Sequence, residues 1–218
     1  MAEKIYPDSG VELKPFTAKY YDKLMNAISF GLYRNFIEKA VDDMGIEPGD
    51  KILDLGCGTG RNAALMAKHL SENGRITGMD VSEIMEKQFI KKFEADQRLT
   101  FIRQRADIPF DLEDQFDKIL ISFVIHGFPH EVRKKVIENV VKHLKPGGTF
   151  LLLDFAEFEM NKMPFHHRII FKSIECKYAF DFIERNWKEI LGQYGFGNFR
   201  EKHYIRQYVR LLKATKEL

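Results

Sequence analysis

Apolar residues along the chain fall into two patterns that predict two kinds of secondary structure. In some segments they form short continuous runs, which are typical of strands buried on both faces of a sheet. In others they recur every three or four positions, which indicates amphipathic helices. The runs predict strands at residues 51–55, 75–79, 99–103, 116–123 and 149–155, and the recurring pattern predicts helices at 61–70, 83–95 and 130–144. Strands and helices that alternate in this way predict an α/β fold built on a parallel sheet.

The chain on either side of this region is also organised in elements. Residues 16–44 carry a helical pattern that Gly31 divides into two lead helices. Farther along, the pattern predicts helices at 164–176 and 180–194 and two closing strands at 198–203 and 204–212. We therefore expect one domain, 1–218, with a seven-stranded, mostly parallel sheet and helices on both faces. Its expected parts are a helical lead (1–48), a core (49–155), and a helical cap followed by the closing strands (156–218).

A glycine-rich turn is the densest motif in the sequence. It reads Asp54-Leu55-Gly56-Cys57-Gly58-Thr59-Gly60 and includes the end of a predicted strand. Glycine lets the backbone turn sharply and lets a ligand lie against main-chain atoms. The dinucleotide fingerprint G-x-G-x-x-G/A needs a small residue at position 61, where this chain has Arg61. Asp54 would repel a pyrophosphate but suits the ammonium group of a methionine moiety, so the motif favours S-adenosylmethionine over NAD.

A second acidic residue supports the same cofactor. Asp80 stands at the carboxyl end of the second predicted strand, and Val81 follows it. A carboxylate at that edge can accept hydrogen bonds from both hydroxyls of a ribose, in adenosyl sites as in NAD sites. Asp80 alone does not separate the two cofactors, whereas its combination with Asp54 and the glycine spacing does.

Residues 51–155 resemble the class I S-adenosylmethionine-dependent methyltransferases, whose fold is Rossmann-like. The glycine-rich turn resembles their first motif, and Asp80 resembles their ribose-binding acid. The resemblance implies that Ala106-Asp107-Ile108 contacts the adenine and that Ser122 and Phe123, at the end of the fourth strand, lie near the cofactor. The alternatives are a plain turn residue for Asp107, a serine bonded to the backbone for Ser122, and a small filler for Cys57.

The lead at 18–31 is similar to the entry helices of the ubiquinone/menaquinone biosynthesis C-methyltransferases. In that group the Tyr-Asp pair folds over the cofactor, so the resemblance implies a cofactor contact for Tyr21; the alternative is that Tyr20 and Tyr21 anchor the helix on the sheet. After the fourth strand the group continues Gly-x-Arg-Asn, whereas residues 124–127 read Val-Ile-His-Gly. The resemblance therefore does not extend to quinone specificity. The full set expected to bind the cofactor is Tyr21, Asp54, Gly56, Cys57, Gly58, Thr59, Gly60, Asp80, Val81, Ala106, Asp107, Ile108, Ser122 and Phe123.

Candidate chemistry follows from the reaction that this cofactor implies. Methyl transfer from a sulfonium is an in-line displacement, for which a protein positions the acceptor, excludes water and removes a proton. His126 follows the fourth strand at the edge where ligands of open α/β sheets bind, so it is the preferred general base. His130 and Asp154 are less favoured. The alternative for each is a structural or solvated residue, and an acceptor that is already ionised, such as a thiolate, needs no base.

Composition narrows the partners and the compartment. The chain has 218 residues and a net charge of +2, which gives no reason to expect a nucleic-acid partner. Its two cysteines fit a reducing cytoplasm, and from the polar residues 1–10 and the short apolar runs we expect neither a signal peptide nor an integral membrane segment. The adjacent His166 and His167 lack the spacing of metal ligands, so we expect no metal. Basic residues of the tail are expected on the wet face of edge strands: Arg200, Lys202, His203, Arg206, Arg210 and Lys213.

The sequence thus predicts a cytoplasmic methyltransferase that acts on a small-molecule acceptor. Two narrower or different functions remain as alternatives. One is methylation of a quinone or menaquinone precursor at carbon, and the other is a non-catalytic adenosyl-binding module that regulates a partner. The acceptor atom and the oligomeric state stay open.

Overall fold

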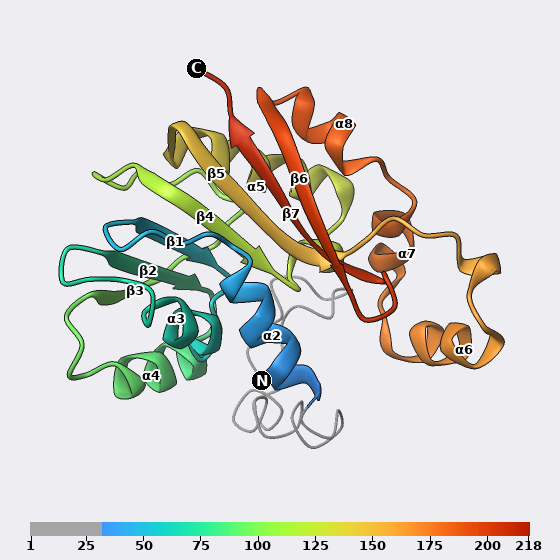
Figure 1. The fold of residues 1–218 in the computed structure, drawn as a ribbon, viewed down its shortest axis with the longest axis horizontal. Coiled ribbons are helices and arrows are strands. Elements are labelled where there is room, and N and C mark those ends of the chain that lie inside the picture. Colours follow the sequence, from blue (N-terminus) through green and yellow to red (C-terminus); the bar gives the residue numbers. More distant parts are fainter. Residues whose placement is uncertain (1–31) are drawn as a thin grey trace.

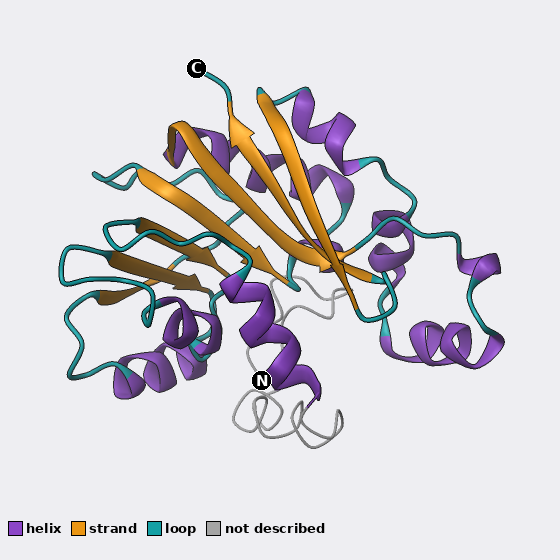
Figure 2. Ribbon diagram, in the orientation of Figure 1, coloured by secondary structure: helices purple, strands orange, loops and turns teal. Residues whose placement is uncertain are grey.

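A computed structural model describes residues 32–218 as a single seven-stranded sheet with helices on both faces (Figures 1 and 2). The strands are β1 (Lys51–Leu55), β2 (Arg75–Asp80), β3 (Leu99–Arg103), β4 (Phe116–Ser122), β5 (Leu144–Phe155), β6 (Phe196–Tyr204) and β7 (Val209–Lys216). Their order across the sheet is β3-β2-β1-β4-β5-β7-β6. The first five strands pair in parallel, and β7 runs antiparallel to both of its neighbours. The predicted α/β fold with a seven-stranded, mostly parallel sheet is therefore confirmed, whereas the first of the two predicted lead helices, before Gly31, lies outside the described residues.

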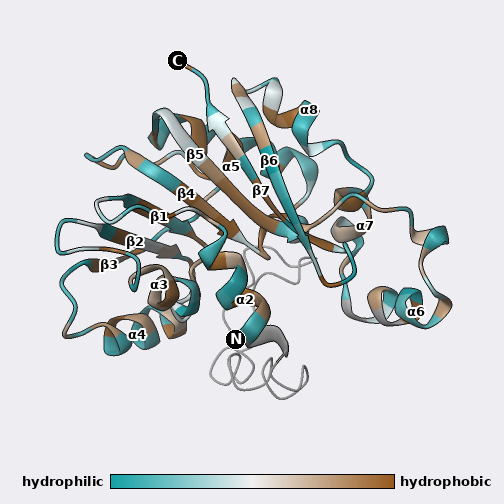
Figure 3. Ribbon diagram, viewed as in Figure 1, coloured by the Kyte–Doolittle hydropathy of each residue, from teal (hydrophilic) through white to brown (hydrophobic). Residues whose placement is uncertain are grey.

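Two hydrophobic clusters hold the helices against the sheet. The helices are α2 (Leu32–Asp42), α3 (Arg61–Met66), α4 (Glu83–Lys92), α5 (His130–His143), α6 (Phe165–Ile174), α7 (Lys177–Ile183) and α8 (Trp187–Gly192), with short 3-10 helices η1 (Ile125–Gly127) and η2 (Met160–Lys162). Helices α2, α3 and α4 contribute to one cluster, and α5, α7 and α8 contribute to the other. Successive residues of β1 serve opposite clusters, Ile52 one and Leu53 the other, because side chains of a strand alternate between faces. Figure 3 shows the resulting concentration of apolar residues in the central strands.

The elements after β5 differ from the prediction in their boundaries. The helix predicted at 180–194 is two short helices, because Asn186 interrupts it and caps α8 by accepting the Glu189 N–H at 3.2 Å. The predicted hairpin turn at 203–204 lies at residues 205–208 instead. Ile205, Arg206 and Gln207 there have φ of 47°, 53° and 71°. These are not turn-forming residue types, so the sequence carries no signal for this turn.

Arg210 corrects the prediction for the basic tail. It was expected on a wet face, but it is 3% exposed. Its guanidinium donates to Glu157 Oε1 at 2.7 Å and to Glu201 Oε2 at 3.1 Å. The physical reason is topological: β7 lies between β5 and β6 rather than at the edge of the sheet.

Strand order also positions the candidate site. The chain leaves β1 toward β2 and β3 on one side, then returns to β4 on the other side of β1. Ligands of open α/β sheets bind at such a switch point, outside the carboxyl ends of the strands. The glycine-rich turn, Asp80 and the loop after β4 all stand at this edge.

Candidate functional site

The glycine-rich turn links β1 to α3 in a conformation that requires glycine. Gly56, Gly58 and Gly60 have φ of 74°, 55° and 73°, in the left-handed region. A Cβ on Gly60 would lie 2.5 Å from the ring of Phe93, and one on Gly56 would lie 2.5 Å from Val124. A Cβ on Gly58 would meet nothing within 4 Å. Packing thus closes the turn at both ends, while its middle leaves space for a ligand against the main chain.

Asp80 is fixed against this turn by the backbone. Its Oδ2 accepts the N–H of Gly58 at 3.0 Å, and its Oδ1 accepts the N–H of Ser82 at 2.9 Å. Burial raises the pKa of Asp80, and the N–H groups of Ser82, Gly58 and Val81 oppose that rise. Each oxygen keeps a second lone pair, so the carboxylate is oriented and still able to accept from a ribose.

Asp54 is the most unusual group at this edge. Its side chain is 1% exposed, and neither carboxylate oxygen has a hydrogen-bond partner among the described residues. Burial, together with the charge of Asp80, raises the pKa of Asp54 to about 7. A buried carboxylate without a partner is costly, and a cation beside it would offset that cost. The carboxylate of Asp54 therefore fits the predicted cofactor, which carries an ammonium group and a sulfonium.

Two other predicted residues of the turn, Cys57 and Thr59, are buried in the structure. Cys57 is buried, and burial raises the pKa of its thiol, which agrees with a small filler rather than a nucleophile. Thr59 is buried, and its hydroxyl accepts from Lys92 Nζ at 3.4 Å. Tyr21 lies outside the described residues, so its predicted contact remains a prediction.

The loop after β3 brings the expected adenine contacts to the same edge. Asp107 is buried and accepts from Arg105 Nε at 3.1 Å and Nη2 at 2.8 Å, so an adenine amine would share it with that guanidinium. Asn139 of α5 donates to the carbonyls of Ala106 and Ile108 at 2.8 and 3.0 Å, which holds the loop against the helix. The side chain of Ile108 is exposed.

A strained residue follows β4. Phe123 has φ of 53°, a conformation that a bulky residue rarely adopts and that occurs preferentially at functional sites. Its N–H donates to Leu153 O at 2.9 Å, and its ring packs edge-on against Phe36 and Phe155 at centroid distances of 6.1 and 6.2 Å. Ser122, the last residue of β4, is half-buried beside it. The sequence carries no sign of this strain.

His126 lies in η1, between two carboxylates. Its Nδ1 is 2.7 Å from Asp154 Oδ1, and its Nε2 is 3.5 Å from Glu175 Oε2. Burial by itself would lower the pKa of His126, but the charges of Asp154 and Glu175 outweigh it and raise that pKa. The sequence favours Asp154 less than His126 and gives no sign of Glu175, which reaches His126 from the end of α6 and stands far from it in the chain.

Arg133 of α5 is a second residue that the sequence did not reveal. It is fully buried, and its guanidinium donates to Ile125 O at 3.1 Å, to His126 O at 3.1 Å and to Tyr178 O at 2.6 Å. A further bond at 2.6 Å joins it to Asp181 of α7. One side chain thus ties η1 and the cap to the core, and this fixes the backbone on which His126 stands. Within a helix of mixed charge, nothing in the sequence separates Arg133 from its exposed neighbours.

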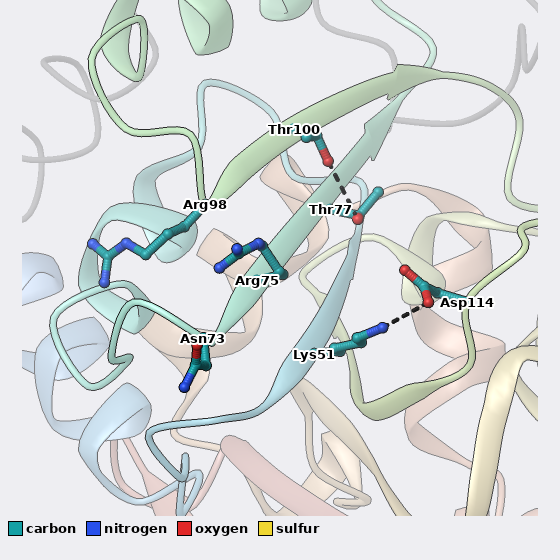
Figure 4. Close-up of a pocket in the computed structure, with 7 residues that line it drawn as sticks. All are labelled: Lys51, Asn73, Arg75, Thr77, Arg98, Thr100 and Asp114. Atoms are coloured by element: carbon teal, nitrogen blue, oxygen red, sulfur yellow. Dashed lines mark hydrogen bonds and ion pairs between the residues drawn. The ribbon is translucent and has the colours of Figure 1, made fainter.

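A polar hollow lies away from this edge, at the amino ends of β1, β2 and β3 (Figure 4). The hydroxyl of Thr100 on β3 donates to that of Thr77 on β2 at 3.4 Å, and Lys51 Nζ forms an ion pair with Asp114 Oδ1 at 2.6 Å (Figure 4). None of the predicted site residues within 32–218 lines it. The hollow and the candidate site are therefore separate features.

Comparisons with known proteins identify a family that matches most of the chain. Residues 14–179 match the model of the ubiE/COQ5 methyltransferase family. The chain is 30% identical over 155 residues to a demethylmenaquinone methyltransferase of Lysinibacillus sphaericus, covering 71% of this chain and 65% of that protein. It is also 30% identical over 141 residues to the enzyme of that name from Staphylococcus aureus, covering 64% and 57%. The chain thus spans less than two thirds of the length of these relatives.

Solved structures share the fold. A SAM-dependent methyltransferase from Aquifex aeolicus has a TM-score of 0.60 at 19% identity, covering 83% of this chain and 89% of that one. A putative O-methyltransferase from Nostoc punctiforme has a TM-score of 0.73 at 16% identity, covering 95% and 63%. At these identities the likeness concerns the fold alone.

Proposed function

Because the chain belongs to the ubiE/COQ5 methyltransferase family, we propose that it transfers the methyl group of S-adenosylmethionine to a small-molecule acceptor. Family membership confirms the predicted superfamily and its cofactor. The observation that carries the proposal is Asp54, a buried carboxylate with no hydrogen-bond partner among residues 32–218, next to a glycine-rich turn that has free space at Gly58. Asp54 pairs with the ammonium group, Asp80 accepts from the ribose, and Asp107 accepts from the adenine amine.

In this proposal His126 is the general base that removes a proton from the acceptor. When bound, S-adenosylmethionine supplies a methyl group on a sulfonium sulfur, which keeps the electron pair of the broken bond. Asp154 holds the Nδ1–H of His126, which leaves Nε2 to take the proton of an unionised hydroxyl. Glu175 then stabilises the imidazolium that forms. Since only the neutral ring can accept a proton, transfer should accelerate as pH rises through the pKa of His126.

For the acceptor, we favour an aromatic molecule of the quinol type. The named relatives are demethylmenaquinone methyltransferases, and aromatic rings surround His126, with Phe155 at 5.0 Å and Phe182 at 6.4 Å. Residues 124–127 depart from the quinone enzymes' Gly-x-Arg-Asn, so the acceptor need not be the relatives' own. We further propose a cytoplasmic location and no nucleic-acid partner, in line with the small net charge.

Calorimetric titration with S-adenosylmethionine and S-adenosylhomocysteine tests the cofactor site. Asp80→Ala should lose binding of both while keeping the circular dichroism of the wild type. Asp111→Ala, which changes an exposed carboxylate, is the matched control and should bind normally. Unchanged affinity in Asp80→Ala would overturn the assignment. Binding by the wild type without methylation of quinols, phenols or thiols would favour the non-catalytic adenosyl-binding module.

A further inference from the structure

The outer side of α6 exposes large apolar side chains. Phe165 is 68% exposed and Ile169 is 48% exposed, and their spacing of four residues puts them on one face of the helix. Ile205, in the turn between β6 and β7, is 52% exposed. Among the described residues, six large apolar side chains are exposed in this way, and these are three of them. Half of the exposed apolar groups therefore belong to two short segments.

These two segments lie side by side. Arg206 Nη1 is 3.3 Å from His167 Nε2, and the ring of His167 packs edge-on against Tyr208 at a centroid distance of 5.8 Å. Figure 1 shows α6 at the periphery of the molecule, beyond α7. We call the combined surface of α6 and residues 205–208 the cap face. The turn contacts α6 through His167, which is two residues from both Phe165 and Ile169, so it borders the helix on the side away from these two side chains.

The charge on the cap face has one sign. Helix α6 reads FHHRIIFKSI and contains Arg168 and Lys172 but no acidic residue, and the turn adds Arg206. The guanidinium of Arg168 lies 5.7 Å from the ring centroid of Phe165, so a cation stands directly beside the most exposed apolar group. Exposed apolar side chains flanked by Arg and Lys are typical of helices that lie in the interface of an anionic membrane.

We propose that the cap face binds the surface of an anionic lipid membrane. Phe165 and Ile169 enter the headgroup region, and Arg168 and Lys172, each three residues farther along the helix, lie near lipid phosphates. An anionic surface attracts each such cation, whereas a stable protein partner would need about 800 Å² of complementary surface per side, more than a few apolar side chains provide. Among the described residues, no helix is long and apolar enough to span a bilayer, so this contact is peripheral.

The cap face is connected to the candidate site through α6 itself. Glu175 follows the last residue of the helix and pairs with His126, and Phe171 packs against Phe155 at 5.1 Å. A membrane under the cap face would therefore lie beside the acceptor side of the site. This consequence rests on the proposed function and suits an acceptor that is dissolved in lipid. Membrane binding itself does not depend on it.

Cosedimentation of the full chain with vesicles tests the proposal. Vesicles of phosphatidylcholine with about 30% phosphatidylglycerol should bind the protein, and pure phosphatidylcholine or about 0.5 M NaCl should weaken binding at least tenfold. Phe165→Ser with Ile169→Ser should reduce binding to the mixed vesicles at least tenfold. Ile90→Ser is the matched control, because it removes an equally exposed side chain, 55%, from α4. Arg168→Gln with Lys172→Gln should remove the preference for anionic lipid.

Three results would overturn the proposal. They are wild-type protein that stays in the supernatant with mixed vesicles, a Phe165/Ile169 double variant that binds like the wild type, and a wild-type dimer that this variant dissociates. The last would make the cap face an interface between two copies of the chain. Calorimetry of each variant with S-adenosylmethionine separates the two proposals: retained cofactor binding with lost vesicle binding concerns the cap face alone, and a failed cofactor titration leaves the vesicle result standing.

Discussion

Replacement of Asp54 by Asn should make the folded protein more stable while removing cofactor binding. The pKa of Asp54 is raised from 3.8 to about 7, so the unfolded chain releases this proton at lower pH than the folded protein does. As pH rises between these two values, ionisation of Asp54 stabilises the unfolded chain more than the folded protein, so the free energy of unfolding falls. Each pKa unit corresponds to about 1.4 kcal/mol, which gives a destabilisation of about 1.5 kcal/mol at pH 5 and about 4 kcal/mol at pH 8.

Urea unfolding of the cofactor-free proteins measures this effect. Asp54→Asn, which has nearly the shape of the neutral acid, should raise the free energy of unfolding by about 4 kcal/mol at pH 8 and by clearly less at pH 5. The exposed control Asp111→Asn should change it by less than about 0.5 kcal/mol at either pH. Calorimetry should show that Asp54→Asn no longer binds S-adenosylmethionine. A variant that is less stable than the wild type at pH 8, or equally changed at both pH values, would refute the reasoning.

Three other substitutions probe the rest of the site. Glu175→Gln should lower the pKa of His126 in an NMR titration and move the rise of methyl transfer to lower pH, because the charge of Glu175 raises that pKa; an unmoved titration would contradict the pairing. Arg133→Gln should lower the free energy of unfolding by about 2–4 kcal/mol in urea, since it leaves buried carbonyls without a donor, and a loss below about 1 kcal/mol would speak against the role assigned to it. Gly60→Ala should cost more than about 1 kcal/mol because of its φ of 73° and the Phe93 ring, whereas Gly192→Ala, with open space around it, should be neutral or stabilising.

The core could be predicted because local patterns determine it. The strand runs and the glycine spacing are each readable within a few residues, and the carboxyl ends of parallel strands must meet at one edge, which places Asp54 and Asp80 together. The contacts that were missed join distant segments. Glu175 reaches His126 only because the cap folds back over η1, and Arg210 is buried only because β7 enters the interior of the sheet. Neither the Glu175–His126 contact nor the burial of Arg210 has a local signal, because the hydrophobic pattern of a strand does not determine its position in the sheet.

The position of β7 also constrains the order in which the molecule can assemble. In the sequence β7 follows β6, but in space it separates β6 from β5, and β6 has β7 as its neighbour in the sheet. Strand β6 therefore cannot join the sheet before β7 has paired with β5. Residues 156–208, which include the whole cap, form the loop that this pairing closes. Closing such a loop requires contacts between distant parts of the chain, which are slow to form. We expect the five parallel strands to gain hydrogen-exchange protection first during refolding and the cap to gain it last, at the step in which β7 inserts.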